Sequence, residues 1–410
     1  MSAEQNYLLN LPGKSCTLKW GWSTINLWNG QTNSCHRCTQ VPIEEGFNFH
    51  NIKFKADQRE KMLRGEWPGE GCQYCKKIED AGGMSDRIAM NRSEKYIPIH
   101  VGSPDNATIH TLEIYFTNKC NMKCIYCTPY YSSLWEKEME DHGKFSTVNI
   151  REISKGVGYE DKNAQFWDWM KNHSHTLKNY NILGGEILYQ DEFLQNIEFF
   201  NNNPRPNLSM TVFSNFKVPL EKFTRYMGML EKLKRDNKVG EVIIMSSIDC
   251  WGPQQEYVRT GMSLKQWEEN MFELRLNFKD INVRTNGVLS SLTIKTIPEF
   301  LLKLDEICAI TNRKIGFSHD FSVNPTVMCA ENFPKGFFDS DMKESIRIMR
   351  QIRTGWDRYQ DKFEGFMHTM NSVEYRPDLV KGLLVYLREL DARRGTDFTT
   401  VFPWLLEFDN

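Results

Sequence analysis

The stretch Leu112–Cys127, LEIYFTNKCNMKCIYC, joins an apolar run to three closely spaced cysteines. The run LEIYF has the residue types of a buried β-strand. Cys120, Cys124 and Cys127 follow it with the spacing C-x3-C-x2-C, which places three thiols on one loop. Three thiolates on one loop can bind three irons of a cubane [4Fe–4S] cluster and leave the fourth iron open for a small chelating ligand. Zinc bound by three thiolates and a water, or chance spacing, are the alternatives.

Beyond this loop the chain alternates between strand-like and helix-like segments. The predicted strands are Leu112–Phe116, Asn179–Leu183, Ser209–Phe213, Val242–Ser247, Ile281–Leu289 and Ile315–Phe321. The predicted helices between them include Phe193–Phe200, Leu220–Arg235, Leu264–Leu276 and Pro298–Ile310. Strands separated by helices predict βα units with parallel pairing and right-handed connections. We therefore expect an α/β fold, a partial (β/α)6 TIM-type barrel over residues 110–330, with its chemistry at the C-terminal ends of the strands.

Residues 1–109 have a different pattern, with Gly/Pro-rich turns, little periodicity and two cysteine pairs. The pairs are Cys35-x2-Cys38 and Cys72-x2-Cys75. Two such pairs can place four sulfurs around a zinc ion or around a second cubane cluster. The pattern predicts a loop-rich, Cys-rich N-terminal module that a bound metal holds together.

The remaining cysteines and the end of the chain give weaker indications. We expect the scattered cysteines to be small buried hydrophobic side chains. They are Cys16, Cys250, Cys308 and Cys329. Residues 331–410 predict a helical C-terminal extension with helices at Asp341–Thr354 and Asp378–Arg394, followed by an apolar tail, TTVFPWLLEF, that docks on a core.

Composition excludes several classes of protein. The 410 residues carry 51 Lys+Arg and 53 Asp+Glu, so no overall charge draws the chain to nucleic acid or to an anionic membrane. No apolar run approaches the roughly 18 residues that cross a bilayer, and the first residues lack the pattern of a secretory signal. We therefore expect a cytoplasmic protein with neither a membrane nor a nucleic-acid partner. In a reducing compartment, clustered cysteines are metal ligands or redox groups rather than disulfides.

The cysteine loop resembles the hallmark of the radical S-adenosylmethionine (SAM) superfamily, C-x3-C-x-aromatic-C, with Tyr126 in the aromatic place. In that family the amino and carboxylate groups of SAM chelate the open iron. An electron from the cluster then cleaves SAM to methionine and a 5′-deoxyadenosyl radical, which abstracts a substrate hydrogen. The resemblance implies catalytic and metal-binding roles for Cys120, Cys124 and Cys127, and an electron donor such as flavodoxin or ferredoxin.

Motifs at the ends of the second and third predicted strands agree with this resemblance. Gly184-Gly185-Glu186 looks like the family's GGE motif. Two glycines let the backbone approach a ligand closely, and the carboxylate can accept hydrogen bonds from the SAM ammonium group. Asn215 stands at a place similar to the family's T-N-G, where a turn-forming residue is the alternative.

The fourth predicted strand ends in Ser247-Ile248-Asp249, and Tyr257-Val258-Arg259 follows. Together they resemble the S-x-D…Y-x-R region of the branch that carries SPASM or twitch auxiliary domains. On this resemblance Ser247, Asp249 and Arg259 belong to the SAM-binding set, and Ser247 and Arg259 hold the carboxylate and ribose region. A turn cap for Asp249 and a surface ion pair for Arg259 are the alternatives.

The segment GCQYCKKIEDAGGMSDR, residues 71–87, resembles N-terminal cysteine segments of twitch-type enzymes. The usual twitch cluster is built after the barrel, whereas no cysteine follows Cys329 here. Any auxiliary site must therefore draw on Cys35, Cys38, Cys72 and Cys75. The metal there is either a second [4Fe–4S] cluster or zinc.

The substrate is open at this level. The last strand ends offer His319 and Asp320 for acid–base chemistry, with hydrogen bonding in the barrel mouth as the alternative. Three functions remain in consideration: a radical SAM enzyme that modifies a peptide or protein side chain, one that acts on a nucleotide, amino sugar or cofactor precursor, and a non-catalytic zinc module. The reaction subclass (oxidoreductase, transferase or lyase) is not decided by the motifs.

Overall fold

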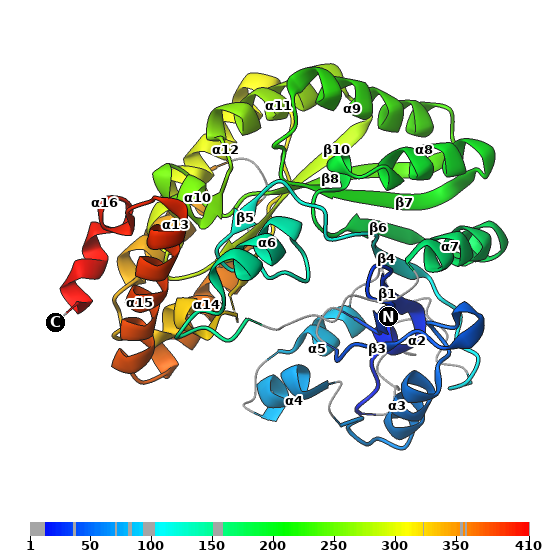
Figure 1. Ribbon diagram of the computed structural model, residues 1–410, viewed down its shortest axis with the longest axis horizontal. Coiled ribbons are helices and arrows are strands. Elements are labelled where there is room, and N and C mark those ends of the chain that lie inside the picture. Colours follow the sequence, from blue (N-terminus) through cyan, green and yellow to red (C-terminus); the bar gives the residue numbers. More distant parts are fainter. Residues whose placement is uncertain are drawn as a thin grey trace.

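The computed structural model of the chain describes residues 13–35, 38–69, 72–80, 84–92, 103–150, 159–322, 324–352, 356 and 359–409. Within these ranges one mostly parallel sheet has nine strands in the order β11-β10-β8-β7-β6-β4-β1-β2-β3 (Figure 1). Its strands are β1 (Trp22–Asn26), β2 (Gln31–Asn33), β3 (Val41–Pro42), β4 (Thr111–Tyr115), β6 (Asn179–Leu183), β7 (Arg205–Ser214), β8 (Val239–Ser247), β10 (Ile281–Leu289) and β11 (His319–Phe321). A second, two-stranded sheet pairs β5 (Lys123–Cys124) with β9 (Arg259–Thr260).

The parallel part of the sheet contains all six strands predicted from sequence, in chain order from β4 to β11. Strand β10 alternates between buried and more exposed residues, with Ile281 and Val283 buried and Arg284 exposed. One face of β10 is therefore buried and the other more exposed. The last strand is shorter than predicted, because residues 315–318 contribute only an isolated bridge between Gly316 and Arg284.

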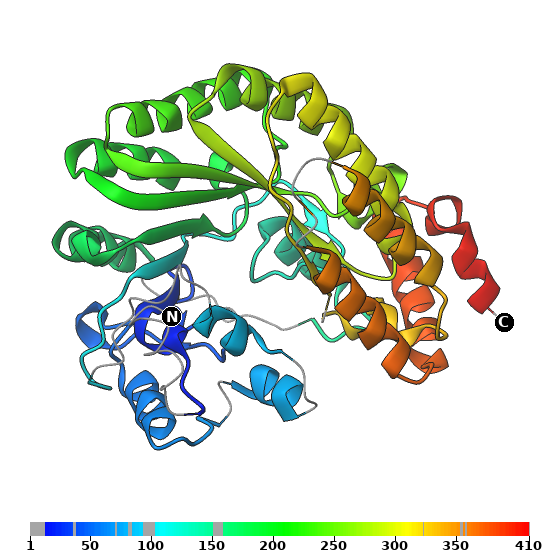
Figure 2. The same ribbon diagram turned by 180° about the vertical axis from the view of Figure 1, so that it is seen from behind.

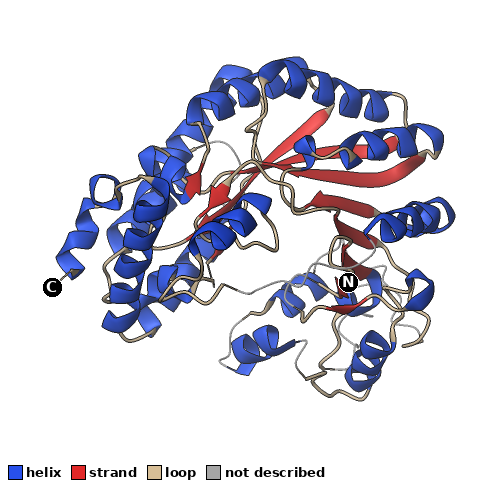
Figure 3. Cartoon of the chain, in the orientation of Figure 1, coloured by secondary structure: helices blue, strands red, loops and turns tan. Residues whose placement is uncertain are grey.

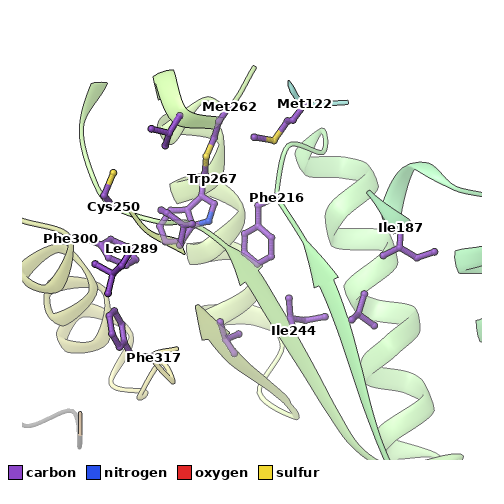
Figure 4. Close-up of a cluster of buried hydrophobic side chains, with 14 of the residues drawn as sticks. Met122, Ile187, Phe216, Ile244, Cys250, Met262, Trp267, Leu289, Phe300 and Phe317 are labelled. Carbon is purple, nitrogen blue, oxygen red and sulfur yellow. The ribbon is translucent and has the colours of Figure 1, made fainter. Parts of the chain in front are cut away.

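Helices cover the outer face of this fan of strands, as the two opposite views show (Figures 1 and 2). They are α7 (Tyr159–His173), α8 (Glu192–Asn202), α9 (Leu220–Arg235), α11 (Leu264–Asn277) and α12 (Ile297–Thr311). In α9 the buried Phe223, Met227 and Leu230 recur at helical spacing and form the apolar stripe that the sheet covers. Figure 4 shows part of this core, in which Phe216, Ile244 and Trp267 are buried.

The N-terminal segment contributes three strands to the sheet, beside its loops and short helices, and its role as a metal-held module stays a prediction. Strand β1 pairs in parallel with β4, and β2 and β3 follow antiparallel. Short strands lie beside the N-terminal end of the chain, among helices and loops (Figure 3). Its helices are α2 (Thr17–Gly21), α3 (Lys53–Leu63), α4 (Gln73–Asp80) and α5 (Asp86–Asn91). All five residues of β1 are buried, but Ser23, Thr24 and Asn26 are polar, so hydrophobic periodicity did not reveal this strand.

The C-terminal extension is helical, as the sequence predicts. It comprises α13 (Asp339–Gln351), α14 (Gln360–Ser372), α15 (Pro377–Arg394) and α16 (Phe398–Val401). The apolar tail docks as expected, since Phe402 and Leu405 are fully buried and the Trp404 ring lies 5.6 Å from the ring of Phe333. No helix in the described ranges has both the length and the apolarity needed to cross a membrane.

Candidate active site at the cysteine loop

The loop that carries Cys120, Cys124 and Cys127 lies beyond the C-terminal end of β4. Its middle forms β5, in which Cys124 pairs opposite Arg259 of β9. The amide of Ile125 donates to the carbonyl of Val258 over 2.8 Å. The cysteine loop and the Tyr-x-Arg motif are therefore joined by backbone hydrogen bonds, although Cys124 and Arg259 lie 135 positions apart in the sequence.

Five consecutive carbonyls of this loop, from Asn121 to Ile125, each accept a hydrogen bond from a side chain. The donors are Lys217 Nζ (3.0 Å), Ser132 Oγ (2.8 Å), Arg394 Nη1 (2.9 Å), Trp135 Nε1 (2.7 Å) and Tyr386 Oη (2.5 Å), in that order along the loop. We call these donors the carbonyl clamp. Ser132 directly precedes α6 (Ser133–His142) and Trp135 lies in it, while Tyr386 and Arg394 both lie in α15. Protein side chains thus fix the path of the loop on both sides of Cys124.

The Gly-Gly-Glu turn packs directly on the same loop. Gly184 and Gly185 have φ values of +92° and +53°, which favour glycine. A Cβ atom on Gly185 would lie 2.2 Å from the carbonyl oxygen of Lys119, just before Cys120. The amide of Glu186 donates to that same oxygen over 3.0 Å. Gly185 thus admits a close approach of the cysteine loop, while Gly184 lies against the Tyr115 side chain of β4, and contact of either glycine with a ligand stays a prediction.

Glu186 is fully buried at the junction of β6 and β7. Its carboxylate accepts hydrogen bonds from the amides of Leu188 (3.2 Å) and Asn215 (2.6 Å). Burial raises the pKa of Glu186 to about 7, against the opposing effect of these hydrogen bonds. The side chain of Asn215 in turn donates to Asn121 of the cysteine loop over 2.9 Å. Both residues connect strand ends to the loop, and contact of Glu186 with SAM stays a prediction.

Asp249 is the centre of a second buried network. Its carboxylate accepts hydrogen bonds from Tyr126 Oη (2.6 Å), from Nε and Nη2 of Arg259 (2.9 and 2.7 Å), and from the amide of Val288 (2.9 Å). Asp249 is 0 % and Arg259 7 % exposed, so the alternative of a surface ion pair is excluded. Nη1 of Arg259 donates a weak hydrogen bond to Cys124 Sγ over 4.0 Å. The pair therefore links the aromatic residue of the loop to the thiol beside it.

The remaining predicted site residues lie in the same region. Ser247 ends β8, is partly buried, and pairs with Asn286 of β10. The three loop thiols are also partly buried, and burial raises the pKa of each, to about 12 for Cys120. The described residues contain no group of three His, Cys, Asp or Glu side chains arranged to hold a single metal ion.

His319 and Asp320 do not form the acid–base pair that the sequence suggested. The His319 ring is fully buried, stacks on Phe317 at 4.3 Å, and donates from Nε2 to the carbonyl of Asp249 over 2.9 Å. Burial lowers its pKa to about 4, so the ring is neutral near pH 7. Asp320 points outward and pairs with Lys362 over 2.6 Å. His319 therefore holds the backbone of Asp249 in place by this hydrogen bond.

The N-terminal cysteines gather around a small cavity of about 20 Å³. The Sγ atoms of Cys35 and Cys38 lie 3.4 Å apart, and Cys72 and Cys75 line the same cavity. Cys16 lines it as well. The sequence grouped Cys16 with the scattered cysteines, because its partners are brought to it only by the fold. It is buried, as expected, but beside the paired cysteines.

Lys19 lines this cavity too and is only 2 % exposed. Its ammonium group donates to Gln58 Oε1. Burial opposes its charge, but the thiol groups of Cys38, Cys72 and Cys35 outweigh burial and raise the pKa of Lys19. A buried cation beside several cysteines fits a centre whose thiolates carry negative charge.

A larger cavity of about 510 Å³ separates the two cysteine sites. Cys127 and Cys38 both line it, one from each site. Five tyrosines contribute to its wall, and we call it the tyrosine cavity. They are Tyr115, Tyr126, Tyr130, Tyr131 and Tyr386. Of these only Tyr126 was singled out from sequence, because the others come from separate elements with no shared spacing.

No protein-family model matches the chain, and no curated protein is significantly similar to it. Among solved structures, Streptococcus suis SuiB bound to S-adenosylmethionine is 12 % identical, with a TM-score of 0.41 over 82 % of this chain and 70 % of that one. A second crystal structure of Streptococcus suis SuiB is 11 % identical, with a TM-score of 0.40 over 82 % of this chain and 69 % of that one. TYW1 with a lysine–pyruvate adduct bound is 15 % identical, with a TM-score of 0.30 over 59 % of this chain and 72 % of that one.

Proposed function

We propose that the chain is a radical SAM enzyme that abstracts a hydrogen from a peptide or protein side chain. The carrying observation is the clamped three-thiol loop at the C-terminal end of a parallel sheet, joined by hydrogen bonds to the Gly-Gly-Glu turn and to Arg259. In α/β barrels this end of the sheet is where chemistry gathers. A small-molecule substrate, such as an amino sugar or cofactor precursor, is the second candidate.

Cys120, Cys124 and Cys127 would hold a [4Fe–4S] cluster with one open iron. The donor set fits this group, because three thiols on a strand-end loop leave one iron without a protein ligand. When bound, the cluster with SAM on that iron supplies an electron that cleaves SAM to methionine and a 5′-deoxyadenosyl radical, which takes the substrate hydrogen. The Arg259 guanidinium, 4.0 Å from Cys124 Sγ, offers a positive charge beside one ligand.

The residues around the loop divide into two roles in this proposal. Gly184, Gly185 and Ser247 stand at strand ends where backbone and hydroxyl groups can contact SAM. Tyr126, Glu186, Asn215, Asp249 and Arg259 complete the proposed SAM-binding set. Because Asp249 and Arg259 already neutralise each other, their first role is to hold Tyr126 and Cys124 in place. Burial of this pair costs solvation that the several hydrogen bonds offset.

A second metal centre is proposed at Cys35, Cys38, Cys72 and Cys75, as a [4Fe–4S] cluster or as zinc. The Sγ atoms of Cys35 and Cys38 lie 3.4 Å apart, and Cys72 and Cys75 line the same cavity, so the fold gathers four thiols that could serve either group. An electron donor such as flavodoxin or ferredoxin, in the cytoplasm, completes the proposal.

Reductive cleavage of SAM tests the proposed function. Anaerobic protein with SAM and dithionite should form 5′-deoxyadenosine, measured by chromatography. Cys124→Ala should abolish it, because two thiols cannot hold the cluster, while Cys308→Ala on α12, far along the chain from the loop, should not. Retained cleavage in Cys124→Ala, or none in the wild type, contradicts the proposal.

A further inference from the structure

Two lysines of the N-terminal segment are fully buried, and their surroundings differ. Lys55 of α3 is 1 % exposed, and its ammonium group lies within hydrogen-bond distance of four oxygen atoms. These oxygens are Ser23 Oγ (2.9 Å), Thr32 Oγ1 (2.8 Å) and the carbonyls of Asn33 (3.0 Å) and Phe49 (2.6 Å). Lys19 of α2 is 2 % exposed, and it lines the small cavity that the N-terminal cysteines share. Oxygens therefore surround one buried charge, and thiols lie beside the other.

Lys19 is held in place along its whole length. Its amide donates to the carbonyl of Cys16 over 3.0 Å, and its carbonyl accepts from Arg59 Nε over 2.7 Å. Its ammonium group donates to Gln58 Oε1 and to the side chain of Cys38. Gln58 is itself 3 % exposed and lies on α3. The helices α2 and α3 thus fix the ammonium group beside a thiol of the proposed second metal centre.

A metal centre at these cysteines would be anionic. Four thiolates carry more negative charge than a zinc ion carries positive charge, so the bound group keeps a net negative charge. The reduction potential of an iron–sulfur cluster likewise depends on its net charge and on hydrogen bonds to its sulfurs. Taking a net charge out of water is costly unless the charge is paired and hydrogen-bonded. Lys19 offers both a positive charge and an N–H donor at Cys38.

We propose that Lys19 is a positioning residue of the second metal centre: its ammonium group donates to the Cys38 sulfur and offsets part of the negative charge of the metal–thiolate group. The inference rests on the second centre of the proposed function, and it adds a residue that the cysteine spacing does not indicate. Replacing a partner of a metal ligand typically changes metal affinity by about 10–100-fold. Loss of the Lys19 charge should therefore weaken the binding of either metal without removing a ligand.

Metal release tests this role in the full-length protein with Cys120, Cys124 and Cys127 replaced by alanine, so that the bound metal belongs to the second centre. The protein is loaded anaerobically and mixed with excess EDTA, and the remaining zinc and iron are measured at intervals. Lys19→Met keeps an unbranched side chain but removes the charge, and it should release metal at least about tenfold faster. Lys19→Arg keeps the charge and the N–H donors, and its release should be slower than that of Lys19→Met.

Gln58→Glu is a second variant, which leaves Lys19 in place. The new carboxylate would neutralise the ammonium group with nearly the shape of Gln58, so metal release should again be faster. Lys55→Met is the matched control, because it removes an equally buried charge that contacts oxygens. It should lower the free energy of unfolding but leave the rate of metal release unchanged.

An unchanged release rate in Lys19→Met and Gln58→Glu, or equal acceleration in Lys55→Met, would overturn the inference. Absence of metal from this centre after anaerobic loading would overturn it as well. If iron is bound, the midpoint potential should be lower in Lys19→Met, because reduction adds negative charge to the centre; an unchanged potential contradicts the role of the charge. Formation of 5′-deoxyadenosine by protein with an intact cysteine loop is measured separately, and its failure counts against the proposed SAM chemistry rather than against Lys19.

Discussion

Replacement of Arg394 tests whether the carbonyl clamp shapes the cysteine loop. The Arg394 side chain is 2 % exposed and pairs with Glu138 over 3.0 Å, while Nη1 donates to the carbonyl of Lys123 and to Thr260 Oγ1. In Arg394→Gln, Glu138 would keep its ion pair with Lys123, whose Nζ lies 2.6 Å from the carboxylate and whose side chain is 29 % exposed. Losing one member of a buried ion pair costs about 3–5 kcal/mol, so with this remaining partner we expect about 3 kcal/mol.

Two measurements separate stability from loop geometry. Urea unfolding of the metal-free protein gives the loss of free energy of unfolding, and the EPR spectrum of the reduced, reconstituted protein reports the surroundings of the cluster. Arg388→Gln on the same helix is the control, because Arg388 is 51 % exposed and pairs with Asp409 at the surface. Such pairs contribute about 0–1 kcal/mol, and its EPR spectrum should match that of the wild type.

Tyr386→Phe provides a milder version of the same perturbation. It removes one hydrogen bond to the carbonyl of Ile125, which costs about 1 kcal/mol. We expect a shifted EPR spectrum in both Arg394→Gln and Tyr386→Phe with iron still bound. If Arg394→Gln loses about 3 kcal/mol while both spectra stay unchanged, α15 stabilises the fold without shaping the loop, and the reasoning about the clamp is refuted.

Two further predictions concern single buried contacts. The pKa of His319 lies near 4 instead of the ordinary 6.5, so its contribution to stability is complete above about pH 6.5 and is lost as pH falls toward 4. This loss amounts to about 3 kcal/mol. The variant His319→Gln keeps an amide donor for the carbonyl of Asp249, and urea unfolding at several pH values should show that its free energy of unfolding depends less on pH than that of the wild type. An equal pH dependence would contradict the burial of a neutral His319. Gly185→Ala would place a Cβ 2.2 Å from the Lys119 carbonyl and should abolish iron binding. Gly143 also has a positive φ, +76° with a ψ of −167°, but open space lies around it. Gly143→Ala should therefore lose about 1–3 kcal/mol of stability from backbone strain and retain iron; similar iron contents in the two variants would show that the close approach is unimportant.

Local patterns predicted the frame of this protein well. The parallel strands from β4 to β10 and the helices α9 and α15 follow from periodicity in short stretches. Spacing alone singled out the three loop cysteines, whose metal-binding role stays a prediction. What these patterns share is that the relevant residues are neighbours in sequence.

The contacts that complete the site escaped prediction because they join distant positions. Tyr386 is 261 positions from the carbonyl it binds, and nothing in its own surroundings marks it. Cys16 directly precedes α2 and lines the same cavity as the paired cysteines, a proximity that its sequence position does not indicate. Glu186 and Arg259 are buried, and their hydrogen bonds in the structure are to other groups of the protein. A motif does not indicate that its charged side chain is buried.

The metal content of the anaerobically purified protein tests the central claim most directly. Iron, sulfide and zinc per chain would be measured beside a variant in which Cys120, Cys124 and Cys127 are all alanine. We predict that about four irons per chain, with matching sulfide, are present in the wild type and absent from the variant. What survives there identifies the N-terminal centre, as about one zinc or about four more irons. Zinc without iron, even after anaerobic reconstitution, would contradict the radical SAM proposal.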